Sequence, residues 1–285
     1  MESTAWRDIV TTALSLADRF RAEGSVAWYR GERDATWALK STLHRHAERY
    51  TARLVKPWSE SECIDHLRDQ NKTLYRNFLA EAWPLLDEHE RSDWGVVFTM
   101  QHFSLPTRLL DWSESFACAV FFAQLRRKPE DPASVWVLDP HYLNGLGCGR
   151  SGIVALHGDT SGPVNLDTMQ WHPKRVAPDQ PLKTIAVAPI FTNPRMVQQR
   201  SRFTLMGDSL LPLDQQFDGK LVREGRLQRL ILPPETFADA EEFLSAAGLT
   251  AFSFFPDIQG LALKHEAQVQ NDIRFALKSY PDQFR

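Results

Sequence analysis

Two short motifs place an arginine inside an otherwise apolar run, and they constrain what this chain can fold into more than any other feature. The first is Trp28-Tyr29-Arg30-Gly31, and the second runs from His102 to Trp112 with the letters HFSLPTRLLDW. A guanidinium in apolar surroundings costs free energy unless it meets a carboxylate, a phosphate or backbone carbonyls. We therefore expect an anion-binding crevice in which both arginines have polar partners and aromatic side chains form the walls.

Length and composition are those of an ordinary globular protein. A chain of 285 residues with 43% hydrophobic and 24% charged residues can bury a large core. Its formal net charge of −3 gives no overall attraction to nucleic acid or to acidic membranes. The three cysteines lack a CxxC spacing, the N-terminus has no signal-peptide pattern, and no apolar stretch approaches the ~20 residues that span a bilayer. These features predict a cytoplasmic protein that does not bind membranes.

Hydrophobic periodicity predicts an α+β fold with one mixed or antiparallel sheet, helical insertions and a helical C-terminal region. Residues 1–24 are expected to form an N-terminal helix, residues 25–264 the main domain and residues 265–285 a tail of the same unit. The expected strands are 26–30, 107–112, 134–139, 184–190, 202–206 and 227–232. The expected helices are 3–23, 59–90 with a break at Pro84, 93–103 with Asp93 as cap, 116–125, 235–247, 256–263 and 267–277.

Two segments give no clear periodicity. Residues 31–58 are predicted to be irregular, and they hold many more basic than acidic side chains. Residues 141–182 are rich in turn residues, and a connection of that length indicates a lid over an active site or a loop.

The first candidate site is Tyr29-Arg30-Gly31. Arg30 would clamp a phosphate or carboxylate, or it would be a structural arginine paired with a core carboxylate such as Asp111. Gly31 would allow a tight turn or the close approach of a ligand to the backbone. Both interpretations of Arg30 stay open on the sequence alone.

The second candidate cluster holds His102, Thr107, Arg108 and Asp111. In a strand Arg108 points to one face and Thr107 and Asp111 to the other, so Arg108 and Asp111 need not pair. His102 with Asp111 would make a general acid–base pair, because a carboxylate orients an imidazole and stabilises its cation. The alternative is a buried hydrogen-bond network that fixes the junction between a strand and a helix.

The third candidate cluster holds Arg195 and Gln199, followed by Arg200 and Arg202. The Gln199 carboxamide both donates and accepts hydrogen bonds, which suits ribose hydroxyls or another carboxamide. A basic edge strand would give the same pattern. Among the tryptophans, Trp28, Trp37 and Trp112 are candidates to stack against a base or a nicotinamide.

Several functional classes are disfavoured because their motifs are missing. The chain has no GxxxxGK[ST] phosphate-binding loop and no GxSxG nucleophile elbow. His44 and His46 lie two residues apart without a nearby carboxylate pair, so no metal site is predicted.

The motifs together resemble the FRG domain, a family named for an N-terminal aromatic-Arg-Gly motif. The similar segments are Tyr29-Arg30-Gly31 with Trp37 and Leu39, His102–Trp112 with the apolar run 117–123, Arg195 with Gln199 and Phe203, Leu232–Glu235, and Phe254–Leu261. Ser201 departs from the pattern, since the family usually has glycine after the glutamine.

The order of the motifs is also similar, more loosely, to ADP-ribosyltransferases. That resemblance implies a site in which Arg30 holds NAD on an early strand, Thr107–Ser113 supply polar groups on a second strand and Arg195–Phe203 complete the site on a third. Tyr29, Gly31, Thr107, Arg108 and Arg195 would bind NAD, while His102, Asp111 and Gln199 would act in catalysis. The third strand lacks the expected glutamate, so Glu32 or Glu235 would have to supply that carboxylate.

The resemblance further implies a bacterial toxin of a toxin–antitoxin or phage-defence system. Such a toxin would modify a nucleic acid or a protein and would have an antitoxin or inhibitor protein as partner. A non-catalytic module that binds a nucleotide or nucleic acid through Arg30 and Arg108 is the alternative. An interaction domain in which the arginines are purely structural is the third hypothesis.

Overall fold

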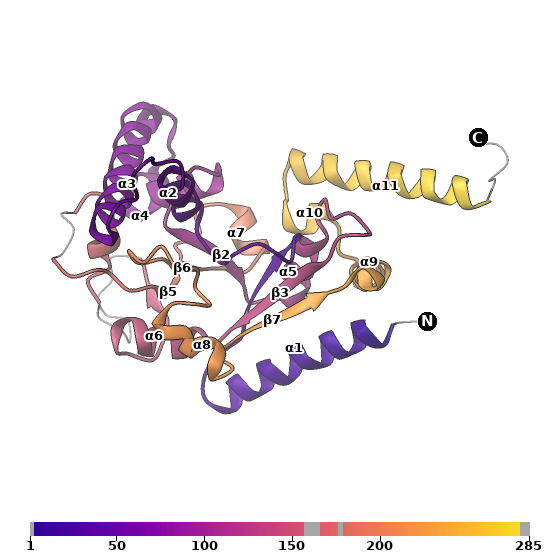
Figure 1. The fold of residues 1–285 in the computed structure, drawn as a ribbon. Helices are drawn as coiled ribbons and strands as arrows, with labels where there is room; N and C mark the ends of the chain where they lie inside the picture. Colours follow the sequence, from indigo (N-terminus) through magenta and orange to yellow (C-terminus); the bar gives the residue numbers. More distant parts are fainter. Residues whose placement is uncertain (1–2, 157–165, 176–178, 280–285) are drawn as a thin grey trace.

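The computed structural model describes residues 3–156, 166–175 and 179–279 (Figure 1). These residues form one mixed sheet of seven strands with helices on both faces, which confirms the expected α+β class. None of the helices in these ranges is both long and apolar enough to cross a bilayer.

The strands follow one another along the chain as β1 (Trp28–Glu32), β2 (Leu109–Ser113), β3 (Ala133–Leu138), β4 (Val154–Ala155), β5 (Ile185–Ala188), β6 (Ser201–Leu205) and β7 (Leu227–Leu232). The α-helices are α1 (Thr4–Ala22), α2 (Thr42–Thr51), α3 (Glu60–Ala82), α4 (Asp93–His102), α5 (Phe116–Gln124), α6 (Pro140–Cys148), α7 (Pro194–Gln198), α8 (Lys220–Arg223), α9 (Phe237–Ala246), α10 (Ala251–Phe254) and α11 (Ile258–Ser279). Short 3-10 helices are η1 (Trp83–Leu85), η2 (Glu88–Arg91), η3 (Thr168–Trp171), η4 (Phe217–Gly219) and η5 (Pro234–Thr236).

The sheet order is β4-β5-β6-β2-β1-β3-β7, so the first two strands lie at its centre. Only β4 and β5 are parallel, and every other neighbouring pair is antiparallel. β1 pairs with β3 over five residues, whereas its pairing with β2 is confined to Tyr29 opposite Ser113. The two central strands therefore diverge beyond that pair.

Three apolar clusters cover the sheet. One joins α1, α5, α9 and α10 to β1, β3 and β7 through residues such as Phe20, Tyr29 and Phe121. A second packs α3 and α4 on the other half, over β5 and β6. A third fills the opposite face under α6 and α8, around Trp28 and Trp112. Figure 1 shows α3 and α4 at one end of the molecule and α1, α9 and α11 at the other.

Most predicted elements are confirmed to within two or three residues, and four expectations were wrong. The segment 31–58 contains α2, and the segment 141–182 begins with α6. The two predicted C-terminal helices are the single helix α11, because the polar residues between them are compatible with a solvent-exposed helical turn. Ser92, not Asp93, caps α4, since its hydroxyl accepts from the Gly95 N–H.

Other sequence-based predictions lie beyond what the structure describes. Parts of the predicted lid, residues 157–165 and 176–178, lie outside the described residues. The division into an N-terminal helix, a main domain and a tail stays a prediction.

α2 was missed because one of its buried residues is a histidine. Its inward face consists of Leu43, His44 and Ala47, and the remaining residues are mostly charged or polar. His44 is fully buried, with Nδ1 2.7 Å from the Ser41 hydroxyl and Nε2 2.9 Å from the Gly207 carbonyl. A polar residue in the apolar row obscures the helical period that the sequence would otherwise show.

Gly31 lets α5 lie directly against β1. A Cβ at this position would lie 1.8 Å from the Ala119 carbonyl oxygen, which is far inside contact distance. The glycine of the motif thus allows the close approach of a helix to the central strand, a role that the sequence analysis did not predict.

We expect Gly31→Ala to lower the free energy of unfolding by about 2 kcal/mol or more, because backbone must move to admit the methyl group. Gly145→Ala is the matched control, since nothing lies within 4 Å of a Cβ at that helical position. There the change should be neutral or stabilising by up to about 1 kcal/mol. Urea denaturation of both variants measures the difference, and equal stabilities would contradict the packing argument.

The buried imidazole of His44 should make the protein less stable in acid. Burial is the main cause that lowers the pKa of His44 to about 3, while an unfolded chain has a value of about 6.5. The unfolded state therefore binds a proton first as the pH falls, and stability is lost between these two pKa values. From about pH 7 to pH 5 this loss should amount to about 2 kcal/mol.

The measurement is the difference in unfolding free energy between wild type and His44→Gln as a function of pH. The difference should shrink on acidification, because glutamine does not titrate. An NMR titration that found His44 protonated near its ordinary pKa would contradict this prediction without recourse to a variant.

Candidate functional site

A cleft of about 720 Å³ opens over the centre of the sheet, where β6, β2 and β1 lie side by side. Its walls come from these strands, from the C-terminal end of α4, from α5 and α7, and from the start of α11. Seven of the nine site residues predicted from the sequence line it: Tyr29, Arg30, Gly31, His102, Asp111, Arg195 and Gln199.

Arg30 lies where β1 and β2 diverge. Its Nε donates to Glu32 Oε1 at 2.7 Å, and its Nη1 donates to the Asp111 carbonyl at 2.8 Å and lies 3.8 Å from Asp111 Oδ2. Because Arg30 and Glu32 are two residues apart on a strand, their side chains share a face. The guanidinium occupies part of the gap between the two strands and satisfies a carbonyl of β2. The structural pairing with Asp111 considered above is thus present, while one edge of Arg30 still borders the cleft.

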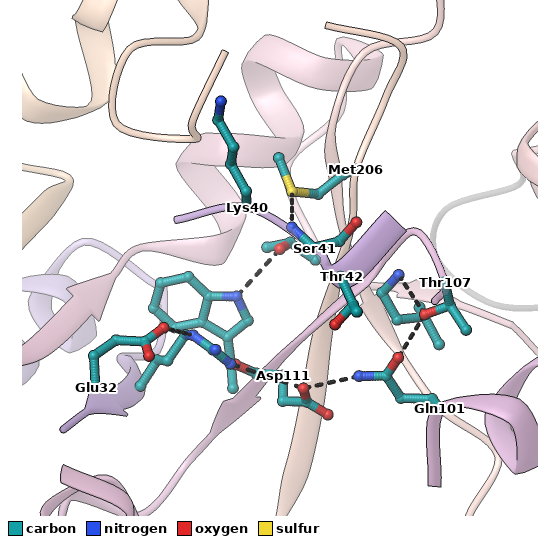
Figure 2. A network of polar contacts seen from close by, with 12 residues as sticks. Glu32, Lys40, Ser41, Thr42, Gln101, Thr107, Asp111 and Met206 are labelled. Carbon is teal, nitrogen blue, oxygen red and sulfur yellow. Dashed lines mark hydrogen bonds and ion pairs between the residues drawn. The ribbon is translucent and has the colours of Figure 1, made fainter. Parts of the chain in front are cut away.

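Asp111 is the end of a short chain of hydrogen bonds that Figure 2 shows. Gln101 Nε2 donates to Asp111 Oδ2 at 2.8 Å, and Gln101 Oε1 accepts from the Thr107 hydroxyl at 2.5 Å. The Thr107 hydroxyl in turn accepts from the Leu109 N–H. The Asp111 side chain keeps 58% of its surface exposed, so the carboxylate is oriented and still open to a ligand.

His102 is the last residue of α4 and lies half-buried in the cleft wall. The structure shows no hydrogen bond between His102 and Asp111. Burial, and next the charge of Arg195, lowers the pKa of His102. The imidazole is therefore neutral at physiological pH and able to accept a proton.

Arg195 and Gln199 lie at the two ends of α7. Arg195 Nε donates to Asp257 Oδ2 at 2.5 Å, its Nη2 donates to Gln259 Oε1, and its guanidinium lies 5.0 Å from the centre of the Phe255 ring. Gln199 Nε2 donates to the Phe254 carbonyl at 3.0 Å. Within the described ranges, the Gln199 Oε1 atom receives no hydrogen bond and borders the cleft.

The cleft carries an excess of positive charge. Four arginines line it, Arg30, Arg33, Arg126 and Arg195, against the carboxylates of Glu32 and Asp111. No carboxylate of the described residues forms an ion pair with Arg33 or Arg126. Trp37 and Phe103 at the lining keep 43% and 65% of their surfaces exposed, and Arg33 lies 5.1 Å from the centre of the Trp37 ring. An anion with an aromatic part matches this lining.

Cys118 also lines the cleft but has no reactive character. It is buried, and burial raises the pKa of its thiol to about 12. The thiolate is the nucleophilic form of cysteine, so this residue contributes packing and not chemistry.

Thr107 and Arg108 do not reach the cleft. Thr107 is buried and acts through Gln101, as described above. The Arg108 guanidinium lies away from the cleft, where Nη1 donates to the Gly207 carbonyl at 2.8 Å and Nη2 lies 2.9 Å from Asp208 Oδ1. Burial works to lower the pKa of Arg108, while the Asp208 charge works to raise it. Arg108 borders a separate pocket of about 420 Å³.

Sequence reasoning missed Gln101 and left Glu32 as one of two choices. Glu32 lines the cleft beside Arg30, whereas Glu235 lies in η5 outside the lining. The alternation of a strand could have identified Glu32, since it shares a face with Arg30. No signal pointed to Gln101, because its role depends on how α4 meets β2. Of the tryptophans, Trp28 lies in the core, while Trp37 and Trp112 line the cleft.

No group of three or more metal-ligating side chains comes together in the part of the chain that the structure describes.

Comparison with known proteins gives one family. The family model for the FRG domain matches residues 25–132, which span β1 to β2 and α5 and include Arg30, His102 and Asp111. No curated protein and no solved structure matches the chain. Arg195 and Gln199 lie outside the matched range, although they complete the same cleft. The chain therefore contains an FRG domain, which spans residues 25–132.

Proposed function

We propose that this protein transfers ADP-ribose from NAD to an acceptor, and that the cleft over β1, β2 and β6 is its active site. One observation carries the proposal. The three segments that the resemblance to ADP-ribosyltransferases assigns to NAD lie on three neighbouring strands and border one cleft with excess positive charge. They are separated by 70 or more residues in the sequence, so their convergence is not a consequence of chain proximity.

The arginines of the cleft suit the pyrophosphate of NAD. Arg30 is held in place by Glu32 and by the Asp111 carbonyl, and its Nη2 has no hydrogen-bond partner among the described residues. Arg33 and Arg126 border the same cleft without a carboxylate partner in the described ranges. Guanidinium groups in a fixed orientation bind phosphate oxygens through charge-assisted hydrogen bonds. The exposed rings of Trp37 and Phe103 suit the adenine or nicotinamide.

The chemistry requires a negative group near the ribose. When the bond from ribose C1′ to nicotinamide breaks, nicotinamide leaves with the electron pair and the ribose becomes oxocarbenium-like. A carboxylate at the 2′-hydroxyl stabilises that charge. Gln199 is neutral, so the exposed Asp111 carboxylate supplies the charge, while Gln199 Oε1 accepts from the ribose or the nicotinamide amide. The acceptor then bonds to C1′, and the neutral His102 takes its proton.

We also propose that the protein acts in a bacterial toxin–antitoxin or phage-defence system with an inhibitor protein as partner, as the resemblance to ADP-ribosyltransferases implies. A second function, non-catalytic binding of a nucleotide, is favoured by one specific observation. The position that holds glutamate in the enzymes is Gln199 here, and its side chain is tied to the Phe254 carbonyl. The experiments below separate the two.

Loss of Arg30 should lower NAD turnover. Arg30→Ala alone would leave the buried Glu32 carboxylate without its partner and would destabilise the protein. The double variant Arg30→Gln/Glu32→Gln removes both charges together. We expect nicotinamide release by this variant to fall by about tenfold or more, the effect of losing a charge-assisted hydrogen bond.

Arg229→Gln is the matched control, because Arg229 is an exposed arginine of β7 outside the cleft lining. Nicotinamide release by wild type is followed by chromatography, with cell lysate as the source of acceptors. NAD binding without turnover would establish the non-catalytic function, and the absence of both would overturn both proposals.

Asp111→Asn should separate catalysis from binding. The substitution keeps the size of the side chain and removes the charge, so NAD turnover should fall by about 100-fold or more while NAD affinity changes far less. Glu114→Gln is the control. Glu114 is the residue directly after β2, and it pairs with Arg202 outside the cleft. Equal turnover in the Asp111 variant and wild type would remove Asp111 from the mechanism.

A further inference from the structure

A tract of basic side chains leads from the mouth of the cleft along α2. It consists of Arg33, Arg45, Arg49, Arg53 and Lys56, together with the exposed rings of Trp37 and Tyr50. None of these five cations has an ion pair with a carboxylate of the described residues. The whole chain has a formal net charge of −3, so the excess of positive charge in this tract is local.

Two of the three carboxylates of the same segment already pair with a cation outside the tract, and the third is hydrogen-bonded to Thr36. Between residues 31 and 58 there are three. Glu32 binds Arg30, Glu48 binds the buried Lys40 at 2.7 Å, and Asp34 Oδ1 accepts from the hydroxyl and the N–H of Thr36. On α3, which packs against α2, Glu62 is occupied as a capping residue with Ser59, and Asp65 and Asp69 border the second pocket.

The tract is continuous with the cleft through direct contacts. Thr42 lines the cleft and begins α2, and its hydroxyl accepts from Arg45 Nη2 at 2.9 Å. Arg49 lies one turn further along and donates to the Arg45 carbonyl at 3.2 Å. Burial, and next the charge of the cleft residue Arg30, lowers the pKa of Arg45. Arg53 follows after another four residues, just beyond the end of the helix.

Like charges at this spacing repel each other. Arg45 and Arg49 at positions i and i+4 destabilise a helix by a few tenths of a kcal/mol. Glu48, the carboxylate between them, is bound to Lys40. A bound polyanion removes this cost, whereas an ordinary surface would carry compensating glutamates. The exposed Trp37 ring adds a second requirement, because a base that stacks on a ring must be unpaired. The Tyr50 ring already stacks on His66.

We propose that this tract binds the backbone of single-stranded nucleic acid and guides one nucleotide into the cleft, so that nucleic acid is the acceptor of the ADP-ribose. This inference rests on the proposed function for the acceptor role, whereas the binding itself does not depend on it. The phosphate and base chemistry is shared by DNA and RNA, and the experiment tests each separately. A protein acceptor is the competing outcome.

The test compares two triple variants with the same change in net charge. Arg49→Gln/Arg53→Gln/Lys56→Gln removes three exposed cations of the tract. Arg7→Gln/Lys128→Gln/Lys264→Gln removes three exposed cations from α1, a loop and α11. Fluorescence anisotropy with labelled DNA and RNA strands of about 20 nucleotides, and with a duplex of the same sequence, measures affinity over a range of salt concentrations.

We expect wild type to bind a single strand more tightly than the duplex. The tract variant should lose about tenfold or more in affinity at about 50 mM salt, and its slope of log affinity against log salt should fall by about 2, because about three phosphate contacts are lost. The control variant should bind like wild type. Equal losses in both triple variants, or no binding by wild type, would overturn the proposal.

Transfer of labelled ADP-ribose from NAD distinguishes this proposal from the function it rests on. Two results together support both the acceptor assignment and the transferase. The single strand is labelled by wild type but not by the tract variant, and the tract variant still releases nicotinamide when the strand is absent. Label found on lysate protein and never on nucleic acid overturns the acceptor assignment and leaves the transferase intact. Binding of the strand without any NAD turnover supports the tract and overturns the transferase.

Discussion

Arg30 and its partners hold together the region where the central sheet opens. β1 is fully paired with β3 but meets β2 only at Tyr29 and Ser113, and beyond that point the guanidinium connects Glu32 of its own strand to the carbonyl of Asp111. A buried carboxylate and a backbone carbonyl without hydrogen bonds would each cost free energy, and one arginine satisfies both. The divergence of β1 and β2 also leaves room for the cleft. Arg30 therefore both satisfies the buried groups of the two strands and borders the site.

Two further contacts fix the walls around this opening. Gly31 lets α5 lie against β1 at a distance that any side chain would prevent. On the other side, the fully buried His44 ties α2 to the Gly207 carbonyl, which also accepts from Arg108. Arg108 is thus enclosed in the structure, whereas Arg30 satisfies buried groups and also borders the cleft. The two arginine motifs look alike in the sequence, but their surroundings give them different roles, because Arg108 is buried against Asp208 whereas Arg30 lines the cleft.

The sequence predicted the fold better than it predicted the site. Strands such as β3 and β7 and helices such as α1 and α5 were recognised because their buried faces follow a regular apolar period. α2 was not recognised because it buries His44, and α6 was not because glycines interrupt its pattern. Within the site, Arg30 and Asp111 were named in advance, but Gln101 was not. Its link between Thr107 and Asp111 exists only because α4 ends beside β2.

The sequence by itself determined that two arginines in apolar runs need polar partners, that the fold is α+β, and that the chain resembles the FRG family. These conclusions follow from local chemistry and spacing, which a linear chain already displays. Only the tertiary structure decided which partners the arginines find. The Asp111 carbonyl lies 81 residues from Arg30, and Asp208 lies 100 residues from Arg108. Gln199 borders the same cleft as Asp111 only because β6 pairs with β2. Pairing between distant strands is set by the packing of the whole sheet, and no local pattern encodes it.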